Sequence, residues 1–177
     1  MANEKIVAAG TEPALISFYY TVDSMFDDAS LRTMYQARNK KDGEGKSRLD
    51  DNSITEDERD IHLGLLEDAV YDVFLTLLKY TKAIDDAIFH NVNYTPAGGV
   101  EALTSGVKIK DNTSYNENYI NVMDKNLRKA IRFYILRDWA GIISEEDDRV
   151  KFNTLYELAM RNVINYGMQL KKVLYSG

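Results

Sequence analysis

The chain has no cysteine, only two histidines and two prolines, and no apolar run that approaches the roughly 20 residues needed to span a bilayer. The lack of cysteine excludes disulfide scaffolds, cysteine-based zinc sites, iron–sulfur clusters and thiol nucleophiles. With 45% hydrophobic and 28% charged residues, the composition excludes intrinsic disorder and low complexity. The first residues, MANEKIVAAGTEP, are polar and predict no secretory signal. We therefore expect a soluble protein, made in a cytoplasm, whose core needs neither disulfides nor metal.

The length of 177 residues predicts one domain, 1–177, because a chain of this size typically buries about 70% of its unfolded surface. The net charge of −6 is unevenly spread. Residues 1–111 carry 12 basic and 20 acidic side chains, whereas residues 112–177 carry 10 and 8. This pattern indicates acidic side chains on solvated helix faces. An alternative is that the acidic half keeps nucleic acid or a like subunit at a distance, since a general DNA-binding domain is normally basic.

The N-terminal residues 1–22 form a candidate arm, and the structure of 13–22 stays open. Thr11 and Pro13 could begin a helix, but the run from Ile16 to Val22 is β-branched and aromatic and would suit a strand equally well. Apolar residues then recur at helical spacing, which predicts a helix near 24–39. The polar, glycine-containing segment 39–52 is predicted to be a mobile loop.

The strongest helix signal lies between residues 55 and 90. Ser53 and Thr55 each precede a glutamate by three residues, which gives two overlapping capping boxes. The apolar period that follows is sustained for over 20 residues, and its middle turns are apolar nearly all round. We expect one helix of roughly 50 Å that is buried on more than one face.

Residues 91–119 lack a helical period and contain one proline and three glycines. Val100 to Leu103 and Val107 to Lys110 flank Thr-Ser-Gly, which predicts a short β-hairpin with Gly106 in the left-handed position. An irregular segment this long is typically functional or ordered by a partner. We therefore interpret 91–119 as an extended interaction loop.

Two more helices follow, one from about 119 to 139 with Gly141 as its stop, and one opened by the capping signature at Ser144. The fold class predicted for the whole chain is mainly α. It is a bundle of three to four helices with a long irregular excursion that contains at most a short hairpin.

The sequence predicts no catalytic, cofactor-binding or metal-binding residues. His62 and His90 would lie roughly 40 Å apart on the same helix, too far to share a metal or a proton. No metalloprotease, EF-hand, phosphate-loop or dinucleotide-binding motif is present. The acidic pairs are adjacent in sequence, so on a helix they point about 100° apart and do not converge. An enzyme whose carboxylates come from different helices stays open.

One cluster of basic side chains lies in the helix predicted at 119–139. Lys125, Arg128, Lys129 and Arg132 share one helix face and could contact phosphate or an acidic partner. Pairing with the acidic half of the same chain is the simpler interpretation. A small DNA-binding regulator that uses this face is the alternative function, although a second helix for groove reading is missing.

The segments SMFDDASLRTMYQARN and LRKAIRFYILRDWAG, within the layout of the whole chain, resemble helical head–tail connector proteins of tailed bacteriophages, the crAss-like phages among them. These are neck-ring or head-completion proteins. The resemblance implies a structural virion protein, made in the host cytoplasm, with no enzymatic activity. It implies a ring of identical subunits between portal and tail, through which DNA passes as non-specific cargo without a membrane partner.

A ring needs contacts between subunits, and the segment 91–119 is the predicted source. Its aromatic residues and its marginal hairpin would gain partners by docking on, or pairing with, a neighbouring copy. The predicted interface residues are Tyr94, Val100, Leu103, Val107, Ile109, Tyr115 and Tyr119. A net negative wall would let DNA slide through such a ring. A surface loop on a monomer is the competing interpretation.

Overall fold

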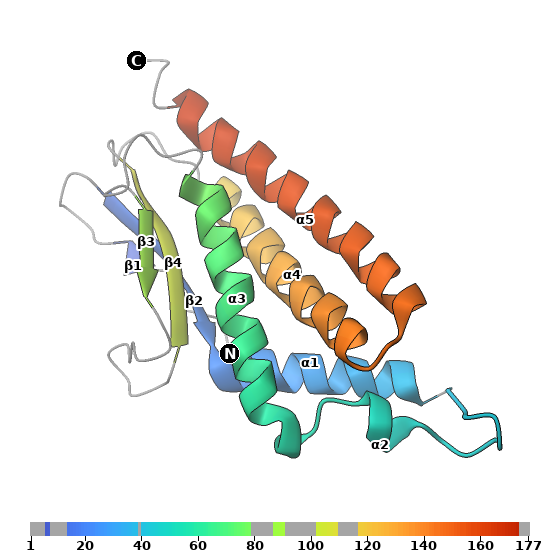
Figure 1. Ribbon diagram of the computed structural model, residues 1–177. Helices are drawn as coiled ribbons and strands as arrows, with labels where there is room; N and C mark the ends of the chain where they lie inside the picture. The colour runs from blue at the N-terminus through green and yellow to red at the C-terminus, as the bar shows by residue number, and fades with distance from the viewer. Residues whose placement is uncertain are drawn as a thin grey trace.

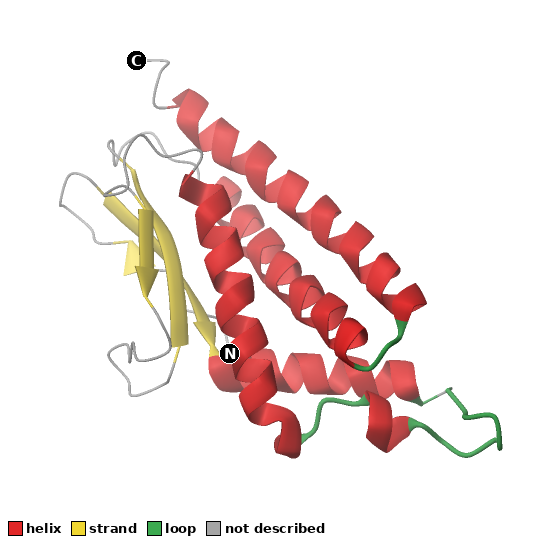
Figure 2. Ribbon diagram, in the orientation of Figure 1, coloured by secondary structure: helices red, strands yellow, loops and turns green. Residues whose placement is uncertain are grey.

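The protein is mainly helical, as the sequence predicts, and it carries a four-stranded sheet on one side (Figures 1 and 2). The computed structural model describes residues 6–7, 14–38, 40–78, 87–90, 102–109 and 117–173. The helices are α1 (Val22–Ala37), α2 (Leu49–Asn52), η1 (Glu56–Glu58), α3 (Arg59–Leu78), α4 (Glu117–Ile142) and α5 (Glu146–Val173). The strands are β1 (Ile6–Val7), β2 (Ala14–Thr21), β3 (Ala87–His90) and β4 (Ala102–Ile109).

The elements form successive layers, with α3 between the sheet and α4, and α5 antiparallel to α4 on the outside (Figure 1). Helix α1 crosses the end of this stack, where it contacts α3 and α4. The apolar circumference of α3 is thus covered in part, by the sheet on one side and by α4 on another, while Ile61, Tyr71 and Leu75 stay 46%, 49% and 39% exposed.

The sheet is larger than the sequence predicts, and the hairpin expected around Gly106 is wrong. The strand order of the sheet is β1-β2-β4-β3, with every neighbouring pair antiparallel. Gly106 lies in the middle of β4, opposite Ser17 of β2 and Ile88 of β3. Strand β2 pairs with all of 102–109 and β3 pairs with 104–107, so partner strands hold the segment extended and the local turn signal is overridden.

Two further boundaries differ from the sequence prediction. The undecided residues 13–22 contain β2, whose last residue Thr21 is also the N-cap of α1. The helix expected at 55–90 ends at Leu78, and 87–90 forms β3 instead. The segment Ala-Ile-Phe-His continues the helical period, but its β-branched and aromatic residues fit a strand once β4 offers an edge. His90 therefore does not share a helix with His62.

One of the two predicted capping boxes opens η1, which leads directly into α3. The Glu58 carboxylate accepts hydrogen bonds from the Thr55 backbone N–H, at 2.8 Å, and from the Thr55 hydroxyl. These bonds hold the pKa of Glu58 below its ordinary value. The Ser53 hydroxyl, at the C-cap of α2, instead donates to the carbonyl of Leu49, the first residue of that helix, at 2.6 Å.

Neither Gly141 nor Ser144 has its predicted role. Gly141 lies inside α4, which continues to Ile142. Ser144 adopts a left-handed φ of 60°, and the Glu145 and Ser144 N–H groups donate to Ala140 and Gly141 carbonyls at 2.8 and 3.2 Å. This is a Schellman ending with serine where glycine is usual. Helix α5 begins after Glu145, which is one residue beyond the predicted cap.

The core lies where α1, α3 and α4 meet and continues toward α5. Its fully buried large side chains are Tyr20, Ile54, His62, Leu66, Met123, Leu127, Ile131 and Ile135. Thr33 on α1 is buried with them, and its hydroxyl accepts the Ile54 N–H at 2.9 Å. This bond fixes the segment between α2 and η1 against α1.

Candidate functional site

Charged side chains from distant segments of the described chain gather at the end of the bundle. Lys40, Arg48 and Asn52 come from the segment after α1, and Glu145 and Asp148 come from the turn into α5. We call these five residues the loop–turn cluster. The Lys40 ammonium lies 2.7 Å from a Glu145 oxygen and 2.6 Å from an Asp148 oxygen.

Glu145 is the centre of the loop–turn cluster. Besides Lys40, its carboxylate accepts hydrogen bonds from Asn52 Nδ2 at 3.0 Å and from the Arg48 guanidinium at 3.3 Å. The hydrogen bond from Lys40 holds the pKa of Glu145 below its ordinary value. Burial lowers the pKa of Lys40, but the two carboxylates outweigh it, and the net direction is upward. Both groups stay charged at neutral pH.

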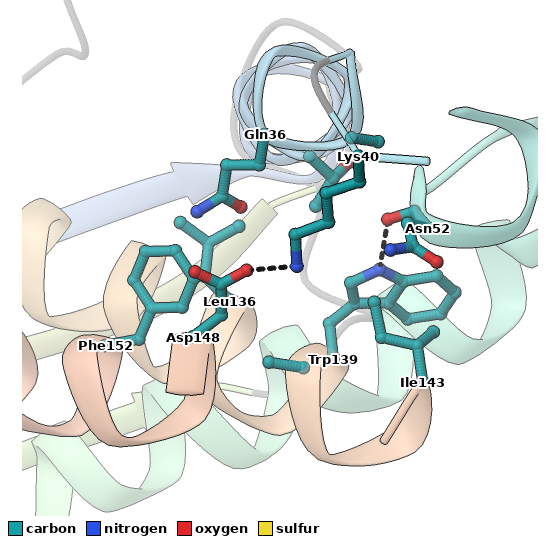
Figure 3. Close-up of a pocket in the computed structure, with 11 residues that line it drawn as sticks. Gln36, Lys40, Asn52, Leu136, Trp139, Ile143, Asp148 and Phe152 are labelled. Carbon is teal, nitrogen blue, oxygen red and sulfur yellow. Dashed lines mark hydrogen bonds and ion pairs between the residues drawn. The ribbon is translucent and has the colours of Figure 1, made fainter. Parts of the chain in front are cut away.

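Trp139 lies against the same cluster, and its indole N–H donates to the Asn52 carbonyl at 3.0 Å (Figure 3). Gln36, Lys40, Asp148 and Phe152 are among the residues that line a small cavity beside it. The volume of this cavity is about 10 Å³. That is about the space one water molecule requires, so no organic substrate fits.

A shallower groove of about 440 Å³ lies between α4 and the start of α5. Its charged side chains pair with each other: Arg137 lies 2.6 Å from Asp138, and Arg149 lies 3.1 Å from Glu146. Arg137 also stacks on Tyr134, with its guanidinium carbon 4.2 Å from the ring centroid. The groove therefore presents neutralised ion pairs to a ligand.

Behind the groove, Tyr156 connects α5 to α3. Its hydroxyl donates a hydrogen bond to the Asp72 carboxylate, and its ring meets Tyr134 edge-on with 5.7 Å between centroids. Burial raises the pKa of Tyr156, and the hydrogen bond to Asp72 raises it further. The phenol therefore stays protonated and acts as a donor that ties the two helices together.

The basic face predicted on 119–139 is divided in the structure. The Arg132 guanidinium pairs with Asp28 of α1, and Arg128 donates to the Tyr19 carbonyl at 2.9 Å. Arg128 also pairs with Asp124 at 3.2 Å. Lys125 and Lys129 are exposed. Thus both arginines join α4 to the acidic half of the same chain or to β2, which is the simpler of the two interpretations of the sequence.

The predicted interface residues fall into three groups. Leu103, Val107 and Ile109 lie in β4, where their backbones pair with strands of the same chain. Val107 has strands of this chain on both sides, so it cannot pair with a strand of a neighbouring copy, whereas Leu103 and Ile109 pair with β2 alone among the described strands. Docking of these residues on a neighbouring copy stays a prediction. Tyr119 lies in the first turn of α4. Tyr94, Val100 and Tyr115 lie outside the described residues.

Within the described ranges, no group of three or more histidine, aspartate or glutamate side chains could hold a metal ion. His62 is buried in the core, 5.2 Å from the Phe26 ring in an edge-on contact. Burial lowers its pKa to about 4 against an opposing effect of the Met25 backbone, and the charge of Arg59 makes a smaller contribution in the same direction as burial. His62 is therefore a neutral core residue at physiological pH.

Sequence reasoning missed two features of the surface. The loop–turn cluster joins residues about a hundred positions apart, and no local spacing indicates such pairs. The second feature is an exposed apolar group on α1: Leu31, Met34 and Tyr35 are 53%, 45% and 64% exposed. The sequence could have indicated this exposed group, because helical spacing places these residues on the side of α1 opposite the centre of its buried residues, such as Ala29.

No helix among the described residues is long and apolar enough to cross a membrane. Comparison of the chain with protein-family models, with curated proteins and with solved structures finds no match.

Proposed function

We propose that this protein is a structural virion protein of a tailed bacteriophage that forms an oligomeric ring in the neck and links portal to tail while DNA passes. The proposal rests on the resemblance of the whole-chain layout to head–tail connectors and on the mainly helical fold. It includes the expectations that the protein has no enzymatic activity, binds no cofactor and acts in the virion.

The observation that favours this proposal over a DNA-binding regulator is the use of Arg128 and Arg132 within the chain. These arginines form the centre of the only basic face predicted from the sequence, and the structure assigns their guanidinium groups to Tyr19, Asp124 and Asp28. A regulator needs such groups for phosphate. In this chain they hold α4 against β2 and α1, which leaves them less available to phosphate.

The charge of the protein fits a channel that does not retain DNA. The net charge is −6. Of the four basic residues predicted to share a face, Lys125 and Lys129 are exposed and could contact phosphate. Weak, unspecific contact is what passage of DNA requires.

The sheet limits the strand pairing predicted between neighbouring copies of such a ring, whereas docking of 91–119 on a neighbour stays a prediction. Since β4 is paired on both sides, the edges of the sheet are β1 and β3. Edge strands carry unpaired backbone groups that a second chain can use. We propose that contact between copies involves these edges and the residues that flank β4, with portal, tail or other neck proteins as further partners.

The decisive test is imaging of the assembled particle. Cryo-electron microscopy of virions whose copy of this protein carries a fused tag should show a ring of identical, mainly helical subunits between portal and tail. A protein that is absent from purified virions, or that sits elsewhere in them, contradicts the proposal.

The alternative, a DNA-binding regulator, is tested by gel shift at low salt. The ring protein should bind DNA weakly, and replacement of Lys125 and Lys129 by alanine should change little. The matched control replaces Lys41 and Lys46, two exposed lysines of the loop after α1. Tight, steeply salt-dependent binding that is lost only in the Lys125/Lys129 variant would favour the regulator.

A further inference from the structure

Helix α1 presents a row of exposed side chains to solvent on the side opposite the core. Asp27, Leu31, Met34 and Arg38 follow one another at spacings of four, three and four residues. At 100° per residue, all four directions fall within an arc of about 60°. We call them the α1 row. Tyr35 borders the row and is 64% exposed.

The buried residues of α1 show that the row is not part of this chain's core. Val22, Met25, Phe26, Ala29, Thr33 and Ala37 are the buried residues of the helix. They centre on the opposite side of the helix. Leu31 and Met34 are 53% and 45% exposed, although both are large and apolar. Two such neighbours one turn apart form the apolar centre of the row.

The ends of the row carry opposite charges. Asp27 lies one turn before Leu31, and Arg38 lies one turn after Met34. Arg38 still has helical backbone angles, so its side chain continues the row. Neither residue forms an ion pair with any of the described residues. In contrast, the flanking carboxylates Asp23 and Asp28 are paired, with Arg59 and with Arg132.

This order of charge, apolar pair and opposite charge is complementary to itself when reversed. If two copies of α1 pack antiparallel about a two-fold axis, Leu31 of one copy meets Met34 of the other. The same register places Asp27 opposite Arg38 at both ends of the contact, which gives two ion pairs. A parallel arrangement would instead place like charges opposite each other.

We propose that α1 is a docking site for a second copy of this chain, bound antiparallel through the α1 row. The contact involves few side chains, against about 20 to 30 residues per partner in a standard interface. The dimer is therefore weak and depends on concentration. A two-fold contact joins only two copies, so it is separate from the contacts that build a ring. The dimer proposal and the ring proposal can therefore be contradicted independently of each other.

The test is sedimentation of the full chain at low salt over a range of concentrations. The wild-type chain should dimerise reversibly, and Leu31→Asp should abolish the dimer. The matched control, Leu158→Asp, changes a leucine of α5 that is 52% exposed and should leave the dimer intact. Circular dichroism should show that both variants fold, since both positions face solvent.

Charge reversal tests the register. Asp27→Arg alone and Arg38→Asp alone each place like charges opposite each other and should weaken the dimer about tenfold. An equimolar mixture of the two variants should form a mixed dimer of wild-type affinity, because each introduced arginine then faces an introduced aspartate. In a parallel dimer like charges already face each other, so neither single variant would be weaker than the wild type.

The proposal is overturned if the wild-type chain stays monomeric up to about 1 mM, the range in which even weak specific contacts are populated. It is equally overturned if Leu31→Asp and Leu158→Asp weaken the dimer to the same extent, or if mixing the two charge variants fails to restore it. A different protein, or another segment of this chain, seated on the row would produce the first of these results.

Discussion

The centre of the bundle and its loop–turn end are held together by different forces. At the centre, α3 and α4 bury Leu66, Leu127 and Ile131 completely, and the contact is apolar. At the loop–turn end, Lys40, Glu145 and Asp148 retain roughly a fifth to a third of their side-chain exposure and attract each other as charges. Burial of apolar surface is large and insensitive to salt, whereas part-exposed ion pairs are weak and screened. The centre therefore supplies most of the stability, and the end fixes the position of a loop.

The largest effect is expected from a cavity at the centre. Ile131→Ala should lower the free energy of unfolding by about 2 to 5 kcal/mol, because the side chain is fully buried. Urea titration measures the loss. Leu158→Ala, at a position that is 52% exposed, is the control and should change stability by about 0.5 kcal/mol or less. Equal losses in the two variants would mean that α4 is not at the centre of the core.

The second effect is a pH dependence that originates at the centre. The folded chain holds the pKa of His62 at about 4, below its ordinary value of 6.5. Above pH 6.5 the ring is neutral in both states. Between pH 6.5 and pH 4, His62 binds a proton in the unfolded chain but not in the folded chain. The free energy of unfolding therefore falls as the pH falls, by up to about 3 kcal/mol.

Substitution tests whether His62 causes this pH dependence of the free energy of unfolding. Unfolding of the wild-type chain at pH 7.5 and at pH 5 should show the difference, and His62→Leu should remove most of it. The control is His90→Gln, in β3, which should keep the slope. Retention of the slope in His62→Leu would contradict the neutral, buried state of His62.

The third effect concerns the loop–turn end and is smaller. Lys40→Met should cost about 1 kcal/mol at low salt and less at high salt, because the ammonium bridges two part-exposed carboxylates. A double-mutant cycle with Glu145→Gln measures the coupling. Lys46→Met, at an exposed position of the same loop, should have no measurable effect. If salt does not change the coupling energy, the contacts at the loop–turn end are not screened ion pairs, and the contrast with the apolar centre is wrong.

The smallest effects come from the turn between α4 and α5, and both are stabilising. Ser144→Gly should gain about 0.5 to 1 kcal/mol, because serine is strained at a left-handed φ. Gly141→Ala should gain a similar amount, since the position is helical and the new methyl group would meet Arg149 at an ordinary distance of 3.5 Å. Thermal unfolding measures both. If Gly141 were the helix stop, its replacement would destabilise the protein.

Periodicity predicts the centre of this molecule well. The helices expected at 24–39 and 119–139 exist at 22–37 and 117–142, and the inward residues Met123, Leu127 and Ile131 are buried. Helical spacing is a local property, and burial of the apolar face decides where each helix packs. For the same reason the capping box at Thr55 could be found from the sequence.

The sheet and the candidate site could not be predicted in the same way. Strand pairing joins residues such as Tyr20 and Leu103, which are far apart in sequence, and no local pattern reports it. The short run 87–90 fits a helix and a strand equally well until β4 is present. The ion pairs of Lys40 and the internal use of Arg132 likewise depend on which surfaces the helices bring together. Of these contacts, the sequence indicated only that basic residues of 119–139 would pair with the acidic half of the chain.

The direct passage from β2 into α1 has a mechanical consequence. Thr21 ends the strand and caps the helix, so no flexible residue separates the sheet from the crossing helix. A pull on β2 along its axis is therefore transmitted to α1, which is anchored to the bundle by the Thr33 hydroxyl and the Asp28–Arg132 pair. The bundle, rather than a loop, therefore bears a load that is applied to β2.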